Sequence, residues 1–86
     1  MPYRHAPRLA WQLIGGEAVV IDLAGARTLG LNPVGSLIWS LLPRLDEAAI
    51  AQEMTRRFDV PLEDAESDVR AFLRVLGEQG LVVEAG

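Results

Sequence analysis

The sequence predicts an α+β fold that is winged-helix-like, in which a three-stranded antiparallel sheet is followed by three helices. Three short stretches of alternating apolar residues are separated by glycine-containing turns. Three later stretches have the apolar spacing and the end signals of helices. The connections are short, so we expect neighbouring elements to pack as a single domain over residues 8–83. Residues 1–7 contain two prolines and no periodicity, and are expected to form a loose arm.

The three expected strands cover residues 8–14, 17–23 and 27–31. The first two are joined by Gly15-Gly16, a two-residue turn in which both positions can take a positive φ. The alternating apolar positions are Leu9, Trp11 and Leu13 in the first strand, Val19, Ile21 and Leu23 in the second, and Leu29 and Leu31 in the third. In such a meander the third strand, or the first, is left with an open edge.

The strand-to-helix junction lies at Asn32-Pro33. The Asn32 side chain can accept a hydrogen bond from a free backbone N–H of a new helix. Pro33 suits the first helical position, where its missing N–H costs nothing. The apolar stripe that follows is formed by Val34, Leu37, Ile38, Leu41 and Leu42. A first helix is therefore expected from Pro33 to about Leu42.

Two more helices are expected after Pro43. Asp46 is a candidate cap for a helix over residues 47–58. A third helix is expected over residues 62–79, ended by Gly80, with Leu81-Val82-Val83 returning as an extended tail. The acidic residues in the first turns of the third helix are Glu63, Asp64, Glu66 and Asp68, an order that suits the helix dipole.

The third helix is apolar on more than one side. Its central apolar residues, expected to be core, are Val69, Phe72, Leu73 and Leu76. Ala71 and Val75 lie a quarter-turn or more away from that stripe. They belong either to a helix packed between two neighbours or to the wall of a groove.

Composition narrows the possible functions. The chain has no cysteine and one histidine, His5, in the expected arm, so we expect no catalytic residues, no metal and no cofactor. The net charge is −4, which suits nucleic acid poorly. The chain has no signal peptide and no apolar run long enough to cross a membrane, so a cytoplasmic location is expected.

The segment Gly30-Leu31-Asn32-Pro33, with Ile38-Trp39 after it, resembles the PqqD-like family of peptide-recognition elements in ribosomal-peptide biosynthesis. Further residues fit the pattern of that family: Asp22, Asp68-Val69, Phe72-Leu73, Leu76 and Gly80-Leu81-Val82. The resemblance extends from about Trp11 to Val83. The turn Asp22-Leu23-Ala24-Gly25 differs from the Pro-Glu-Gly-like hairpin of the PQQ pathway, which favours another pathway such as that of lasso peptides.

The resemblance implies a non-catalytic, stand-alone winged-helix peptide chaperone. It would hold the leader of a precursor peptide as a strand added beside the third strand, against the third helix. It would present that peptide to a modifying enzyme, such as a protease, a cyclase or a radical enzyme. The implied peptide-binding residues are Arg27, Thr28, Leu29, Gly30, Leu31, Asp68, Ala71, Phe72 and Val75.

Two alternatives remain at this level. The first is a winged-helix DNA-binding regulator, although the third helix begins with four carboxylates where base contacts would be made. The second is a structural module that forms a homodimer through the open sheet edge. Gly30 is compatible with the addition of either a leader peptide or a second copy of the chain at this edge, because a residue without a side chain lets another backbone approach closely.

Overall fold

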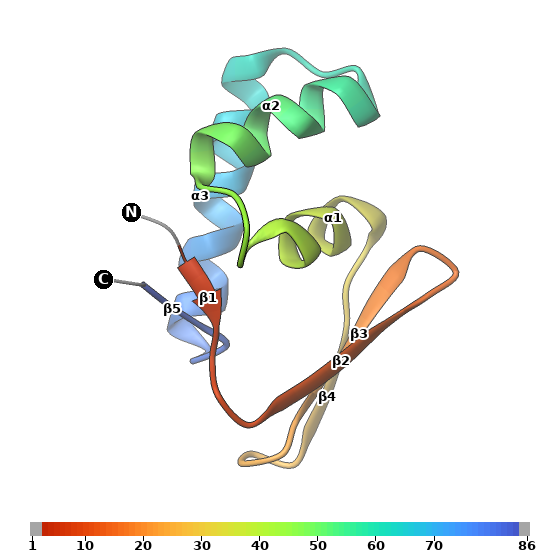
Figure 1. The fold of residues 1–86 in the computed structure, drawn as a ribbon, viewed down its shortest axis with the longest axis vertical. Helices are drawn as coiled ribbons and strands as arrows, with labels where there is room; N and C mark the ends of the chain where they lie inside the picture. Colours follow the sequence, from red (N-terminus) through yellow and green to blue (C-terminus); the bar gives the residue numbers. More distant parts are fainter. Residues whose placement is uncertain (1–2, 85–86) are drawn as a thin grey trace.

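The computed structural model describes residues 3–84 and contains two small sheets and three helices (Figure 1). The elements are β1 (Tyr3–His5), β2 (Leu9–Ile14), β3 (Glu17–Asp22), β4 (Arg27–Gly30), α1 (Pro33–Leu41), α2 (Glu47–Phe58), α3 (Leu62–Glu78) and β5 (Val82–Glu84). The predicted α+β order is confirmed, and each predicted strand and helix boundary lies within one residue of the observed one. Within the described part of the chain, none of the helices combines the length and apolarity needed to cross a bilayer.

The larger sheet has the strand order β2-β3-β4, with both pairings antiparallel. Ala18 and Val20 of β3 are buried against the helices. The apolar residues of the opposite parity, Val19 and Ile21, point to the outer side of the sheet, where the Ile21 side chain is 42% exposed. The apolar residues that alternate in the predicted strand, Val19 and Ile21, therefore do not face the core, which is contacted by Ala18 and Val20 instead.

Ser36 of α1 is part of the hydrogen-bond ladder between β3 and β4. Its hydroxyl accepts a hydrogen bond from the Ala18 N–H (2.6 Å) and donates one to the Leu31 carbonyl (3.1 Å). The Leu31 N–H in turn donates to the Ala18 carbonyl (2.9 Å). Because Ser36 is 1% exposed, this bridge fixes α1 on the sheet without help from water.

The helix ends follow the predicted signals. Asn32 Oδ1 accepts from the Gly35 N–H (2.7 Å), which caps α1, and Asp46 caps α2 in the same way. At the end of α3, Gly80 has a φ of +75°, and the Leu81 N–H returns to the Leu76 carbonyl (2.9 Å). That turn brings β5 back beside β1.

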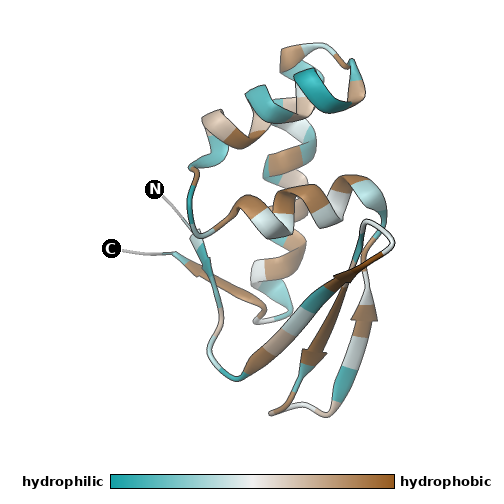
Figure 2. Cartoon of the chain, turned by 45° about the vertical axis from the view of Figure 1, so that its right-hand side comes forward, coloured by the Kyte–Doolittle hydropathy of each residue, from teal (hydrophilic) through white to brown (hydrophobic). Residues whose placement is uncertain are grey.

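The core lies between the sheet and the three helices, and Trp39 of α1 is at its centre with no exposed surface. The largest fully buried apolar side chains are Trp39, Ile38, Leu42, Ile50, Met54, Val20 and Val69. Figure 2 shows hydrophilic residues alternating with hydrophobic ones along the helices, as expected where one side of each helix packs inward.

The prediction of a loose arm over residues 1–7 is wrong for residues 3–5, and Met1 and Pro2 lie outside the described residues. Tyr3–His5 forms β1, which pairs antiparallel with β5 at the other end of the chain. The His5 ring stacks on the Trp39 ring at a centroid distance of 4.0 Å, and His5 Nε2 lies 2.8 Å from the Trp39 carbonyl oxygen. A three-residue strand is too short to show an alternating pattern, so the sequence around it does not predict this pairing.

The Ser36 bridge predicts a large effect for a small change. Ser36→Ala leaves a buried N–H and a part-buried carbonyl without their partner, so the free energy of unfolding should fall by about 1–3 kcal/mol. Urea denaturation measures this change. Ser40→Ala is the matched control, because the Ser40 hydroxyl bonds only the Leu37 carbonyl of its own helix (3.0 Å), and it should change stability by about 0.5 kcal/mol or less. Equal effects of the two changes would contradict the bridge.

His5 predicts a loss of stability in mild acid. Burial lowers the pKa of His5 below its ordinary value of 6.5, because desolvation disfavours the charged ring, and the hydrogen bond to the Trp39 carbonyl offsets this only in part. The unfolded chain then binds a proton more readily, so stability is fully present above about pH 6.5 and falls as the pH drops towards the folded pKa. Unfolding curves between pH 7.5 and 5 should show this fall in the wild-type protein. His5→Gln should remove that part of the pH dependence, and a profile that keeps it would assign the effect to carboxylates instead.

Candidate functional site

The outer edge of β4 has backbone groups with no strand beside it. Leu31 and its alternate neighbour Leu29 direct their N–H and C=O groups towards β3, as the bond from the Leu31 N–H to the Ala18 carbonyl shows. Thr28 and Gly30 must then direct theirs away from β3. Within residues 3–84 no strand pairs with this edge. An extended chain laid beside β4 would find its hydrogen-bond partners at these two residues.

A groove of about 320 Å³ lies between α1 and α3, close to the point where β4 leads into α1. It is lined by Asn32, Val34, Gly35, Ile38, Asp68, Ala71, Phe72 and Val75. Val75 is 46% exposed, although it is a large apolar side chain on an otherwise amphipathic helix. The groove therefore offers mainly apolar surface, with one carboxylate, Asp68, among the residues that line it.

Gly35 explains how the two helices come so close. A Cβ atom on Gly35 would lie 3.0 Å from the Phe72 ring and 3.2 Å from Asn32 Oδ1. The absence of a side chain lets the Phe72 ring rest directly on the first turn of α1. A larger residue at this position would require the Phe72 ring to shift by a few tenths of an ångström.

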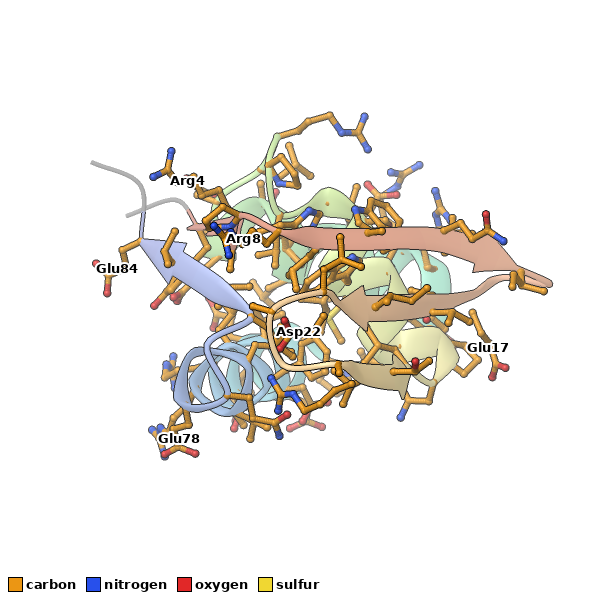
Figure 3. All side chains as sticks on the ribbon, turned by 90° about the horizontal axis from the view of Figure 1, so that it is seen from below. Arg4, Arg8, Glu17, Asp22, Glu78 and Glu84 are labelled. Carbon is orange, nitrogen blue, oxygen red and sulfur yellow. The ribbon has the colours of Figure 1, made fainter. Side chains whose placement is uncertain are left out.

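The other end of β4 is tied to the end of α3. Arg27 Nη2 donates to Asp22 Oδ2 (2.9 Å) and to the Gln79 carbonyl (3.1 Å). Asp22 also accepts from the N–H groups of Ala24 and Gly25, so it closes the turn before β4. The hydrogen bond from Arg27, and then that from Gly25, hold the pKa of Asp22 below its ordinary value. Figure 3, seen from below, shows Asp22 at the turn that faces α3.

These contacts give the edge of β4 two fixed ends. At one end Arg27 joins the strand to Gln79, the residue that follows α3, and at the other Gly35 and Phe72 bring α1 against the middle of α3. The free backbone groups of Thr28 and Gly30 lie between them. An open strand edge and an apolar groove are thus held side by side by bonds of the fold itself.

The residues implied by the resemblance fall into three groups. Asp68, Ala71, Phe72 and Val75 all line the one groove. Thr28 and Gly30 carry the free edge, whereas Leu29 and Leu31 direct their backbone groups to β3 and have half-buried side chains. Arg27 uses its side chain within the fold. Contact of all nine residues with a peptide stays a prediction.

Sequence reasoning missed the α1 side of the groove. Val34 and Ile38 belong to the predicted apolar stripe of α1, and Asn32 is predicted to cap that helix, but none of the three is among the predicted peptide-binding residues. The available signal was Gly35, because a glycine inside the first turn of a helix weakens that helix and often marks a close approach by another group. Here the approaching group is the Phe72 ring.

The comparisons with known proteins agree with this geometry. The family model described as Coenzyme PQQ synthesis protein D (PqqD) matches residues 17–82. No curated protein sequence matches the chain. One similar solved structure is TbiB1 in complex with the TbiA(beta) leader peptide, with 28% identity and a TM-score of 0.88 over 96% of this chain and 98% of that one. Another is the lasso peptide synthetase B1 complexed with the leader peptide, with 27% identity and a TM-score of 0.86 over 98% of this chain and 100% of that one.

The family match includes most of the described elements. It begins at the first residue of β3 and ends in β5, so it contains β4, the three helices and every residue that lines the groove. Residues 17–82 are well over half of the 86-residue chain. The solved structures extend the likeness over nearly the whole chain, β1 and β2 included. The chain therefore belongs to the PqqD family.

Proposed function

We propose that this chain binds the leader of a ribosomally made precursor peptide as a fourth strand on β4 and presents that peptide to a modifying enzyme. The observation that carries the proposal is the free edge at Thr28 and Gly30 beside the groove between α1 and α3. The two similar solved structures, each a complex with a leader peptide, support it. A strand on β4 would direct alternate side chains towards α3.

The energetics require side-chain anchors. About four new backbone hydrogen bonds, worth roughly 1 kcal/mol each, are nearly cancelled by ordering a similar number of residues at about 1–2 kcal/mol each. Micromolar affinity needs about −8 kcal/mol. Two or three apolar side chains of the leader, each worth roughly 1.5–3 kcal/mol when buried, must supply the rest. The exposed faces of Phe72 and Val75 are suitable surfaces for them.

We propose a binding role without catalysis. His5, the one histidine of the chain, bonds the Trp39 carbonyl and is not among the residues that line the groove. Asp68 is the groove's one carboxylate, and it would disfavour acidic side chains of the leader rather than act on them. Glu63, Asp64 and Glu66 are exposed in the first turns of α3, which argues against DNA as the ligand.

Strand addition predicts a specific effect of proline. Thr28→Pro removes the outward N–H of an edge residue, a position where proline is tolerated in a sheet. Leader affinity, measured by fluorescence polarisation with a labelled leader peptide, should fall about fivefold or more, which corresponds to the loss of about 1 kcal/mol. Thr28→Ala, which keeps the N–H, is the control and should bind like the wild-type protein. Unchanged affinity of a folded Thr28→Pro protein would place the peptide elsewhere.

The groove predicts that one new charge weakens leader binding. Val75→Glu puts a carboxylate at the apolar wall beside Asp68, so leader binding should weaken at least tenfold while the melting temperature changes little, because Val75 is 46% exposed. Leu62→Glu is the matched control, since Leu62 is in the same helix, is 45% exposed and undergoes the same change of charge. Leu62 does not line the groove. Similar losses in both variants would show a charge effect rather than a site.

A further inference from the structure

A second cleft, of about 390 Å³, lies on the other side of α1 from the groove. It is formed by the β2–β3 hairpin tip, α1, the following turn and the last residues of α2, and it is lined by Leu13, Gly16, Pro33, Ser36, Leu37, Ser40, Leu41, Arg44, Arg57 and Phe58. In Figure 1 the hairpin tip approaches the start of α1 while α2 passes above it. We name this cleft the arginine cleft.

The arginine cleft and the leader groove share α1 as a wall but use different faces of it. Pro33, Leu37 and Ser40 follow the i, i+4, i+7 spacing of one helix face, whereas the groove uses Val34 and Ile38. Neither cleft shares a lining residue with the other. A ligand in the arginine cleft would therefore leave the leader groove free.

The walls of the arginine cleft include several apolar side chains, and one of these, Leu13, is largely exposed to solvent. Leu13 pairs with Ala18 in the sheet and so points to the helix side, yet its side chain is 52% exposed. It lines the cleft together with Leu37 and the half-buried Phe58. An exposed leucine facing a hollow lined by apolar side chains is suited to holding an apolar side chain of another molecule.

The rim of the arginine cleft is positive in a chain of net charge −4. Its charged lining residues, among those the structure describes, are Arg44 and Arg57. Arg57 pairs with Glu53 through Nε at 3.2 Å, and Arg44 has no ion pair within residues 3–84. Guanidinium groups at the edge of an apolar hollow favour a carboxylate, which they bind with two parallel hydrogen bonds.

We propose that the arginine cleft docks a segment of the modifying enzyme that carries apolar side chains next to a carboxylate. This inference rests on the proposed function: the enzyme would bind on one face of α1 and act on a peptide that is held in the groove on the other face. A second copy of this chain is a poorer occupant, since two molecules of charge −4 repel each other at low salt. The separation of the two clefts lets one small domain hold the peptide and the enzyme at once.

The experiment uses the modifying enzyme encoded beside the precursor gene and the labelled leader of that precursor. The test variant is Arg44→Gln/Arg57→Gln. The matched control is Arg4→Gln/Arg56→Gln, because it also removes two exposed charges, and Arg56, like Arg57, pairs with Glu53 (2.7 Å) but does not line the cleft. Enzyme affinity is measured by biolayer interferometry at 50 and 300 mM salt, and leader affinity by fluorescence polarisation.

The test variant should lose at least tenfold in enzyme affinity and most of its salt dependence, while the control changes less than twofold and both bind the leader normally. Leu13→Asp should also lose enzyme binding. Equal enzyme affinity of the two double variants would overturn the inference. So would loss of enzyme binding in Ile21→Glu, on the outer side of the sheet, with the arginine variant unaffected. A wild-type protein that fails to bind the leader would instead overturn the proposed function, which the leader assay reports separately.

Discussion

The position of α1 depends on one buried hydroxyl. Ser36 bonds β3 and the residue after β4 at the same time, so the helix cannot shift without breaking the sheet at its end. Asn32 fixes the direction in which the helix leaves the strand. Since α1 forms one wall of the groove and one wall of the arginine cleft, the geometry of both surfaces follows from these two polar side chains. Apolar packing around Trp39 holds the helix against the core, and these hydrogen bonds fix its position relative to the sheet.

An open strand edge is useful for binding and dangerous for solubility. The chain limits the danger by keeping β4 to four residues and by placing the Arg27–Asp22 ion pair at its start. Gly30, at the other end, has no side chain to strengthen pairing with an unrelated strand. Such an edge binds weakly through its backbone alone, so a partner must also fill the neighbouring groove. If a peptide binds here as proposed, its side chains would determine selectivity and its backbone would provide only the register.

Local signals were sufficient for most of the fold. Asn32-Pro33, Gly15-Gly16 and Gly80 each act within a few residues, and the predicted turns and helix ends are all found. The core side of β3 could not be predicted, because both parities of that strand are apolar and the choice is made by α1, which packs on Ala18. The β1–β5 pairing joins opposite ends of the chain and has no local pattern at all. In the candidate site, helical spacing left Ala71 and Val75 of α3 open between core and groove, and the family resemblance decided for the groove. The α1 residues were missed because their helical spacing is the same whether they face a core or a groove.

The pairing of β1 with β5 has a consequence for how the molecule folds and opens. Tyr3 lies opposite Glu84, so this contact closes nearly the whole chain into a loop. Closing so long a loop in an unfolded chain loses conformational entropy, and the loss becomes small only after the rest of the structure has brought the two ends together. We therefore expect it to form last and to open first, as a unit separate from the helices. Its opening would take the His5 ring from Trp39 and admit water to one face of the core. Substitutions within Tyr3–His5 would act on this same unit, so we expect them to change how readily it opens before they change the packing of the helices.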